Sequence, residues 1–522
     1  MRVGLTVFLG VASGVACGPA PRPEGATLLF ASGADLQSIN PLVAIHPLAK
    51  QVQKHILFLT LAAYDEAIEP VPRLASWQWS EGRTVLRFAL RRDVRWHDGR
   101  PTTADDVVWT LRMARHPETA YPRARDLTAV TRVSRVDDYT VELRFAQAQP
   151  TFPDVLTDLA ILPRHLFAGL APAEIRTAAF NQNPVGNGPF RFVEYRPNQR
   201  WVFARVDDFP ESLGRPRLDR FVVVVVDEST TKLAALTSGE LDFAGINPAH
   251  ASFVRDDRRL TVIDYPVQFV NALIWNVRRP PFDDVRVRRA VALALDRQLL
   301  VDAYLYGFGV LADGPVSPDH PWFESPAPVG YDVDAAEALL EAVGWRRGDD
   351  GVRQREGRRL SFRLLTVGSA DNALEQMIQA QLRRVGIEME IRQLELSTFL
   401  SVAQGRARDF DALITLVPGD LALGHVAALF EGAAGPLAYS GLQSPDFEGA
   451  LARVREAQTA GELEAGWRDA QRVIEREFPV TWLYHARGVQ GVNRRVRGVS
   501  LDLRGELAGV AGWWIADREE LP

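Results

Sequence analysis

Hydrophobic and polar positions alternate in two stretches near the start of the chain. Residues 84–91 and residues 139–146 each place large apolar side chains at every second position, as β-strands with one buried face do. Between them, Thr103 stands where a helix N-cap belongs. Asp105 and Asp106 follow in the first turn, where carboxylates suit the positive end of the helix dipole. The pattern predicts a strand–turn–helix–strand arrangement of the α+β kind.

Longer apolar runs alternate with helical patterns from residue 220 onward. Residues 220–246, "RFVVVVVDESTTKLAALTSGELDFAGI", predict a buried strand, a helix that ends at Gly239 and a second strand. From such βαβ-like units we predict two α/β lobes, with the α+β segment inserted early and with crossings between the lobes near residues 262–266 and 484–488. The further units are a helix at residues 286–300, a helix at 335–343 closed by Gly344, a helix, Gly386 and a strand within 372–394, and a buried strand at 410–417.

The length and charge of the chain narrow its class. At 522 residues it is too long for one hydrophobic core, because single cores stop growing at roughly 250–300 residues, so two or three domains are expected. A net charge of −6 offers no support for binding to nucleic acid or to an anionic membrane surface. Lys50, Lys54 and Lys232 are the only lysines, a bias that we attribute to genome composition.

The N-terminus carries the pattern of an export signal. Arg2 precedes an uncharged, mostly apolar run of about 14 residues, which is shorter than the roughly 20 residues needed to span a bilayer. Cys17, the only cysteine, follows small residues and resembles the lipid-attachment site of bacterial lipoproteins, although Gly14 stands where leucine is usual. We therefore expect a signal peptide at residues 1–16, lipid attachment at Cys17, a tether over residues 17–26, and a soluble, exported body.

No catalytic motif stands out. His97 and Asp98 are adjacent, so at a strand end their side chains point to opposite faces and neither can orient the other. Asp98 and Gly99 instead form a strong turn signal. The glycine pairs at residues 186–190 and 306–309 are interpreted as turns with close backbone approach, rather than as phosphate loops. We expect no catalytic residue, no metal site and no cofactor, and the twelve tryptophans are compatible with an aromatic-lined cleft between the lobes.

The segment "FALRRDVRWHDGRPTTADDV", residues 88–107, resembles the signature region of the family 5 solute-binding proteins of bacterial ABC importers, the dipeptide- and oligopeptide-binding type. That family carries the pattern F-x-L-R-x-x-V-x-F-H-D-G-x-P-x-T-A-x-D-V, and here Trp96 takes the second aromatic position. The resemblance extends over essentially the whole mature chain. Other matching stretches are "INPL" at residues 39–42, "VPRLASW" at 71–77, "NPVGNGPFRFVEY" at 183–195, "LTSGELDF" at 236–243, "WNVRRPPFDDVRVRRAVALALDR" at 275–297 and "GYDVDAAEALLEAVGW" at 330–345.

The resemblance implies a two-lobed, periplasmic-binding-protein-like α/β fold (type II, cluster C) with an inserted α+β domain. Such a receptor closes around its ligand by a hinge motion. The expected boundaries place lobe I at residues 27–55, 185–262 and 486–522, the inserted domain at residues 56–184, and lobe II at residues 263–485.

The resemblance also implies where a solute binds. In peptide-binding members, an aspartate in a G-W-x-x-D stretch after a buried strand pairs with the α-ammonium group of the peptide, since a charge that is buried on closure must be paired. The matching stretch is "ALITLVPGDL", which places Asp420 at this position, with Gly419 and Val417 as further expected ligand contacts. Val417 replaces the tryptophan and "LALGH" replaces the usual Asp-Pro, so a second interpretation, in which Asp420 only caps a loop, stays open.

The function that the resemblance implies is that of a substrate-binding lipoprotein of an ABC importer. It would capture peptides in the cleft between its lobes and deliver them to a permease and ATPase complex in the inner membrane. We expect a monomer in the cell envelope or periplasm, held at the membrane only through its lipid. The alternatives are a receptor for a nickel chelate, an oligosaccharide or an opine, and an envelope lipoprotein that kept the fold without an import role.

Overall fold

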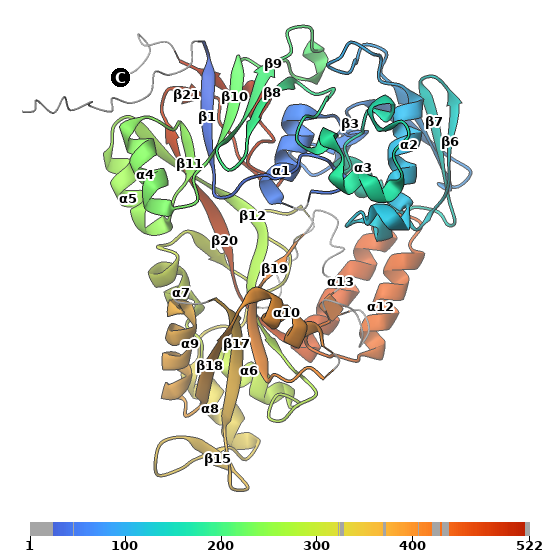
Figure 1. Ribbon diagram of the computed structural model, residues 1–522. Coiled ribbons are helices and arrows are strands. Elements are labelled where there is room, and N and C mark those ends of the chain that lie inside the picture. The colour runs from blue at the N-terminus through green and yellow to red at the C-terminus, as the bar shows by residue number, and fades with distance from the viewer. Residues whose placement is uncertain are drawn as a thin grey trace, which may run out of the picture.

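The computed structural model describes residues 25–44, 46–321, 323, 328–368, 372–405, 407–419, 429–430 and 438–516. Cys17 and Asp420 lie outside these residues. Figure 1 shows an upper and a lower body joined by two long strands, β12 and β20. The fold is therefore two-lobed and α/β, as the sequence predicts.

One large mixed sheet runs through both lobes. It contains parallel pairs, such as β1 with β10, and antiparallel pairs, such as β12 with β20. In spatial order the strands are β18 (Glu388–Leu394), β17 (Ser361–Val367), β19 (Ala412–Pro418), β12 (Leu260–Trp275), β20 (Val480–Asn493), β11 (Phe243–Gly245), β1 (Thr27–Ser32), β10 (Arg220–Val225), β9 (Arg200–Arg205) and β8 (Phe190–Arg196), and β13 (Gly309–Leu311) pairs with β20.

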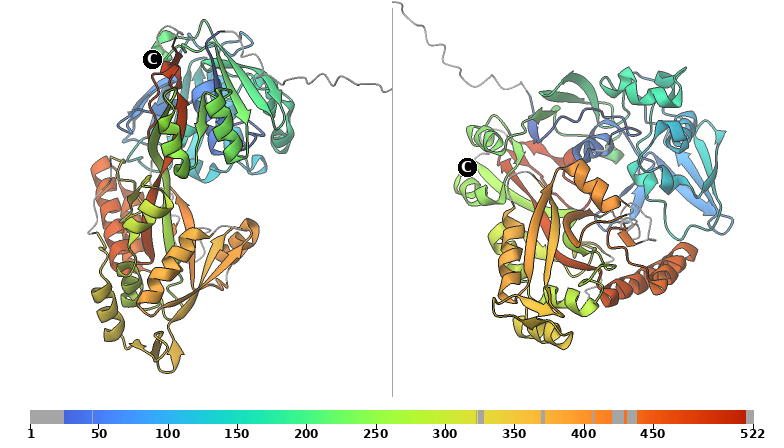
Figure 2. Two further views of the ribbon diagram at one scale, coloured as in Figure 1. Left: turned by 90° about the vertical axis from the view of Figure 1, so that its left-hand side faces the viewer. Right: turned by 60° about the horizontal axis from the view of Figure 1, so that its bottom comes forward.

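The two long strands contain the predicted crossings. β12 has 16 residues and β20 has 14, and they pair antiparallel over most of their length. The pairing shifts register between Pro266 and Val270, in the segment that leaves the upper lobe. Figure 2 shows the same two strands connecting the bodies when the molecule is turned. The predicted domain boundaries themselves stay a prediction.

The early segment forms the expected α+β unit. Its antiparallel sheet has the order β4 (Ala75–Ser80), β5 (Val85–Leu90), β7 (Thr140–Phe145) and β6 (Val130–Asp137), and α2 (Ala104–Arg115) packs against it. The alternation is confirmed, because Leu86, Phe88 and Leu90 are buried while Arg87 and Ala89 are exposed. The backbone N–H of Thr103 donates to Asp106 Oδ2 at 2.9 Å, which closes the predicted N-terminus of α2.

Most of the predicted helices in the lobes are confirmed, and one is corrected. The helix predicted at residues 286–300 is two helices, because Asp296 accepts a hydrogen bond from the N–H of Leu299 and so begins a new helix. The backbone N–H of Asp296 donates to Gln381 Oε1 at 2.6 Å. The helices of the lobes are α4 (Ser229–Ser238), α5 (Ala251–Asp256), α6 (Val285–Leu293), α7 (Arg297–Tyr304), α8 (Val333–Ala342), α9 (Ala373–Arg384), α10 (Leu396–Gln404), α12 (Pro445–Glu456) and α13 (Ala460–Glu477).

Short strands form three small antiparallel sheets. They are β2 (Ala62–Tyr64) with β3 (Pro70–Pro72), β14 (Arg346–Arg347) with β15 (Arg353–Arg355) and β16 (Arg358–Arg359), and β21 (Val496–Arg497) with β22 (Trp514–Ile515).

The turn at His97 is architectural. The Gly186 N–H donates to His97 Nδ1 at 3.2 Å, so Nε2 carries the proton and donates to the Gly188 carbonyl at 3.0 Å. Asp98 faces a different partner, with its Oδ2 2.6 Å from His165 Nε2. The two side chains therefore do not act together, and His97 binds the glycine-rich turn at residues 186–190.

This bonding gives His97 a pH-dependent role in stability. Burial lowers its pKa to about 4, whereas an unfolded histidine titrates near its ordinary value. Between these values the unfolded chain binds the extra proton, so the contribution of His97 is present above the unfolded pKa and is lost as the pH falls. We expect the drop in unfolding free energy from pH 7.5 to pH 5 to be smaller in His97→Gln than in the wild type, by about 1–2 kcal/mol. Urea unfolding at both pH values measures this difference, and equal drops would contradict the assigned role.

Candidate functional site

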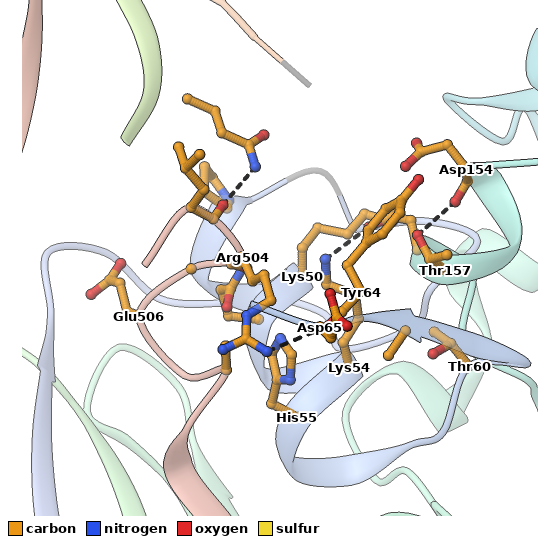
Figure 3. Close-up of a pocket in the computed structure, with 18 of the residues that line it drawn as sticks. Lys50, Lys54, His55, Thr60, Tyr64, Asp65, Asp154, Thr157, Arg504 and Glu506 are labelled. Carbon is orange, nitrogen blue, oxygen red and sulfur yellow. Dashed lines mark hydrogen bonds and ion pairs between the residues drawn. The ribbon is translucent and has the colours of Figure 1, made fainter. Parts of the chain in front are cut away.

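A cavity of about 550 Å³ lies where the predicted lobes and the inserted domain meet. Its wall includes α1 (Pro47–Val52), the π-helical turn η1 (Gln53–Leu57), β2, β3 and α3 (Val155–Asp158). The crossing segment of β12 at residues 265–269 and the C-terminal segment at residues 503–511 complete it. Figure 3 shows these side chains gathered from segments far apart in the sequence.

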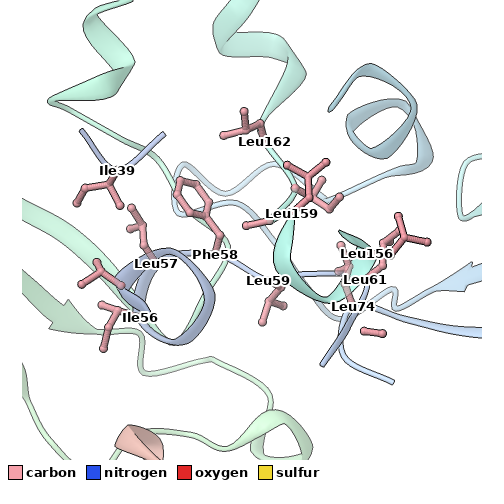
Figure 4. Packing of buried hydrophobic residues seen from close by; sticks show 14 of the residues in the cluster. Ile39, Ile56, Leu57, Phe58, Leu59, Leu61, Leu74, Leu156, Leu159 and Leu162 are labelled. Carbon is pink, nitrogen blue, oxygen red and sulfur yellow. The ribbon is translucent and has the colours of Figure 1, made fainter. Parts of the chain in front are cut away.

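Apolar packing orients one side of this wall. Ile56 and Leu57 are fully buried in the core of the upper lobe, together with Leu156 of α3. Figure 4 shows Ile56 and Leu57 on one side of this apolar cluster and Leu156 beside Leu61 and Leu74 on the other. Because the apolar side chains of η1 face the core, the neighbouring Lys54 and His55 are left to line the cavity.

Three cations surround one carboxylate on this wall. Asp158 lies 3.3 Å from Lys54 Nζ, 3.7 Å from Lys50 Nζ and 3.4 Å from Arg123 Nη1. Asp154 adds a second contact to Arg123 at 2.6 Å. Burial acts to raise the pKa of Asp158, but the neighbouring cations outweigh it and hold that pKa well below its usual range. Asp158 is therefore ionised, and it ties α1 and η1 to α3.

The C-terminal side of the wall presents a carboxylate of a different kind. Glu506 Oε2 accepts a hydrogen bond from the neutral amide of Gln490 at 2.9 Å. Within the described residues, no lysine, arginine or histidine nitrogen lies within 4.0 Å of the Glu506 carboxylate. Burial raises the pKa of Glu506 to about 7.

Arg73 and His55 are two further titratable residues of the cavity wall. Arg73 donates to the Leu213 carbonyl at 2.7 Å, and no carboxylate of the described chain lies within 4.0 Å of it. Burial, with Arg91 nearby, lowers the pKa of Arg73 to about 10. Burial, with cations close by, holds the pKa of His55 well below its usual value, so His55 is neutral at physiological pH.

The predicted ligand contacts fall in different places. Gly419 lines the cavity, and its N–H donates to the Gln268 carbonyl of the crossing segment. Val417 is 3% exposed and packs in a core of the lower lobe, beside Val270. Asp420 lies outside the described residues.

Sequence reasoning missed the charged residues of the wall. Lys50 and Lys54 did carry a signal, because two of the chain's three lysines lie four residues apart while every other basic residue is arginine. Asp158 and Glu506 carried none, since their partners lie far away in the sequence. The tryptophan interpretation is corrected, because no tryptophan of the described residues lines this cavity; Trp96, Trp201, Trp275 and Trp513 are buried in the cores instead.

The described part of the chain has neither a cluster of metal-ligating side chains nor a helix suited to a membrane crossing. Over the residues that the structure describes, no group of three or more histidine, cysteine, aspartate or glutamate side chains could hold a metal ion. Over the same residues, no helix combines the length and the apolar character that a membrane crossing requires.

Comparison with known proteins decides the family. The family described as "Bacterial extracellular solute-binding proteins, family 5 Middle" matches residues 69–425. The chain belongs to this family. Family 5 groups extracellular solute-binding proteins and not enzymes.

Individual relatives span the whole family 5 chain. The oligopeptide-binding protein AppA of Bacillus subtilis is 25% identical, covering 98% of this chain and 97% of its own. The structure of AppA in complex with a nonapeptide has a TM-score of 0.76 at 23% identity, covering 95% of this chain and all of that one. NikZ of Campylobacter jejuni in complex with Ni(L-His) has a TM-score of 0.77 at 22% identity, covering 94% and 99%. The two structures share the fold of this chain while holding different solutes.

Proposed function

We propose that this family 5 protein is the peptide receptor of an ABC importer. A lipid on Cys17 would hold it at the membrane, and closure about β12 and β20 would bury the solute before delivery to a permease. The crossing segments support this hinge, because β12 and β20 run from one lobe into the other and the pairing of β12 with β20 shifts register between Pro266 and Val270.

The observation that carries the proposal is the charge of the cavity wall. Arg73 supplies a guanidinium and Glu506 a carboxylate, and neither has an opposite charge within 4.0 Å in the described part of the chain. A peptide carries an ammonium and a carboxylate group, and buried charges are stable only when they are paired. An uncharged oligosaccharide would leave both wall charges without a partner.

Three residues at or just after the end of the buried strand β19, Val417, Gly419 and Asp420, belong to the same proposal. Gly419 already contributes to the cavity wall, and Asp420 follows it directly in the chain. Asp420 would then accept the α-ammonium group of the peptide. The contribution of Val417 would be indirect, because its side chain packs in the core and fixes the end of β19.

Thermal unfolding and titration calorimetry test the solute class. We expect tri- to nonapeptides to raise the melting temperature, because a ligand at about 100 times its Kd adds about 2.7 kcal/mol of stability. Oligosaccharides and Ni(L-His) should produce no rise. Asp420→Ala should weaken peptide binding about tenfold or more, while Asp446→Ala, at a side chain that is 67% exposed, should not.

Each other outcome has a clear meaning. Stabilisation by Ni(L-His) and by none of the peptides would identify a nickel-chelate receptor. Binding of peptides that is unchanged in Asp420→Ala would remove Asp420 as the anchor and leave the peptide assignment in place.

A further inference from the structure

Glu506 differs from Asp154 and Asp158, two other carboxylates of the cavity wall, and from Asp65, which accepts from the backbone N–H groups of Ala67 and Glu69. Asp154 and Asp158 contact lysine or arginine nitrogens at 2.6–3.7 Å. Among the residues that the structure describes, the carboxylate of Glu506 has only the neutral Gln490 amide, whose Nε2 also lies 3.5 Å from the buried hydroxyl of Tyr265. In Figure 3 Glu506 lies on the C-terminal segment, apart from Lys50 and Lys54.

A carboxylate in this setting favours a positive ligand. Removing an ionised carboxylate from water without a cation costs free energy, and the group responds by holding its proton. Burial accordingly raises the pKa of Glu506 to about 7. An ammonium or guanidinium group that enters the cavity would supply the missing charge and release that proton.

We infer that Glu506 forms a cation subsite of the cavity, where its carboxylate binds an ammonium or guanidinium group of the solute. The inference rests on the proposed function, because it takes a peptide as the solute. It is independent of residues 417–420, since Glu506 belongs to a separate part of the wall, the C-terminal segment at residues 503–511. The cationic group can be a lysine or arginine side chain of the peptide, or its α-ammonium group held by Glu506 together with Asp420.

Three short peptides distinguish the two sources. Ala-Ala-Ala offers only an α-ammonium, N-acetyl-Ala-Lys-Ala only a side-chain cation, and N-acetyl-Ala-Ala-Ala neither. Their affinities are measured by calorimetry for the full-length wild type, for Glu506→Gln and for Glu69→Gln, which removes an exposed carboxylate outside the cavity wall. We expect Glu506→Gln to bind one of the two cationic peptides about 10- to 100-fold more weakly and the uncharged peptide unchanged. Glu69→Gln should match the wild type.

Proton release gives a second readout that a structural role would not produce. At pH 6 a group with a pKa of about 7 is about nine-tenths protonated, so binding of the cationic peptide should release close to one proton. Calorimetry in two buffers of different ionisation enthalpy measures this number. Burial keeps the pKa of His55 well below its usual value and the pKa of Tyr265 above its usual value, which sets both apart from Glu506. Glu506→Gln should lose the release.

The outcomes separate the two proposals. If the wild type binds no peptide, the proposed function fails and the subsite fails with it. If the wild type binds the cationic peptides and Glu506→Gln keeps both their affinities and the proton release, only the subsite is overturned. Equal weakening of all three peptides in Glu506→Gln would also overturn it, because that pattern indicates a distorted cavity.

Discussion

Asp158→Asn should lower the free energy of unfolding by about 3–5 kcal/mol, because it removes the counter-charge that Lys50 and Lys54 share. The side chains of Asp158, Lys50 and Lys54 are only 16%, 18% and 20% exposed, so water screens little of the resulting repulsion. The substitution keeps the shape of the side chain and removes only its charge. Urea unfolding near pH 7 measures the loss.

An exposed ion pair provides the matched control. Asp446 contacts Arg476, and the two side chains are 67% and 55% exposed. Asp446→Asn should cost less than about 1 kcal/mol, since solvated pairs contribute little. A loss in Asp158→Asn no larger than in this control would show that the cluster does not hold α1 and η1 against α3.

The acid response of Asp158 has a definite sign. Its folded pKa lies below its unfolded value, so its contribution is complete above the unfolded pKa and is lost as the pH falls. Wild type and Asp158→Asn should therefore converge in stability as the solution is acidified. The Asp158→Asn substitution should also weaken solute binding, because Asp158 holds Lys50 and Lys54, which line the cavity.

Gly186→Ala should destabilise the protein by about 3 kcal/mol or more, because overpacking against backbone cannot be relieved by a side-chain movement. A Cβ at this position would lie 1.9 Å from the Leu57 carbonyl oxygen. A Cβ at the neighbouring Gly188 would also clash with the backbone of Leu57, and the Gly188 N–H donates to the Leu57 carbonyl at 2.9 Å. The turn therefore sets the position of η1, and through it the position of Lys54 in the cavity wall.

Gly461 offers the control for this substitution. It lies exposed in the first turn of α13, where an added Cβ would meet nothing within 4 Å. Gly461→Ala should be neutral or stabilising by up to about 1 kcal/mol, because alanine has the higher helix propensity. Thermal and urea unfolding compare the two variants, and equal effects would show that the close approach at Gly186 relaxes without cost.

The proposed delivery to a permease and the proposed anchoring through Cys17 are separable from solute capture. The cavity, the crossing strands and the predicted hinge all lie within the body of the chain. A variant that lacks residues 1–26 should therefore bind peptides as the full chain does.

Local signals in the sequence determined much of the fold. The two-residue period at residues 84–91, the cap at Thr103 and the glycines that end α4, α8 and α9 act over a few neighbouring positions. They predicted these elements correctly for that reason. The turn at His97 followed from Asp98 and Gly99 in the same way. The length of the match to family 5 then implied the two-lobed arrangement.

The tertiary structure alone decided the composition of the cavity. Lys54 and Asp158 are 104 positions apart, and Glu506 reaches the same wall from near the C-terminus. The break at Asp296 was also missed, since the contact with Gln381 that accompanies it comes from another helix. Periodicity and capping depend on neighbours along the chain, whereas the pairing of a charge depends on which segments the sheet brings together. The sequence therefore determined the elements and the family, and only the folded chain determined which carboxylate is held by cations and which is left for a ligand.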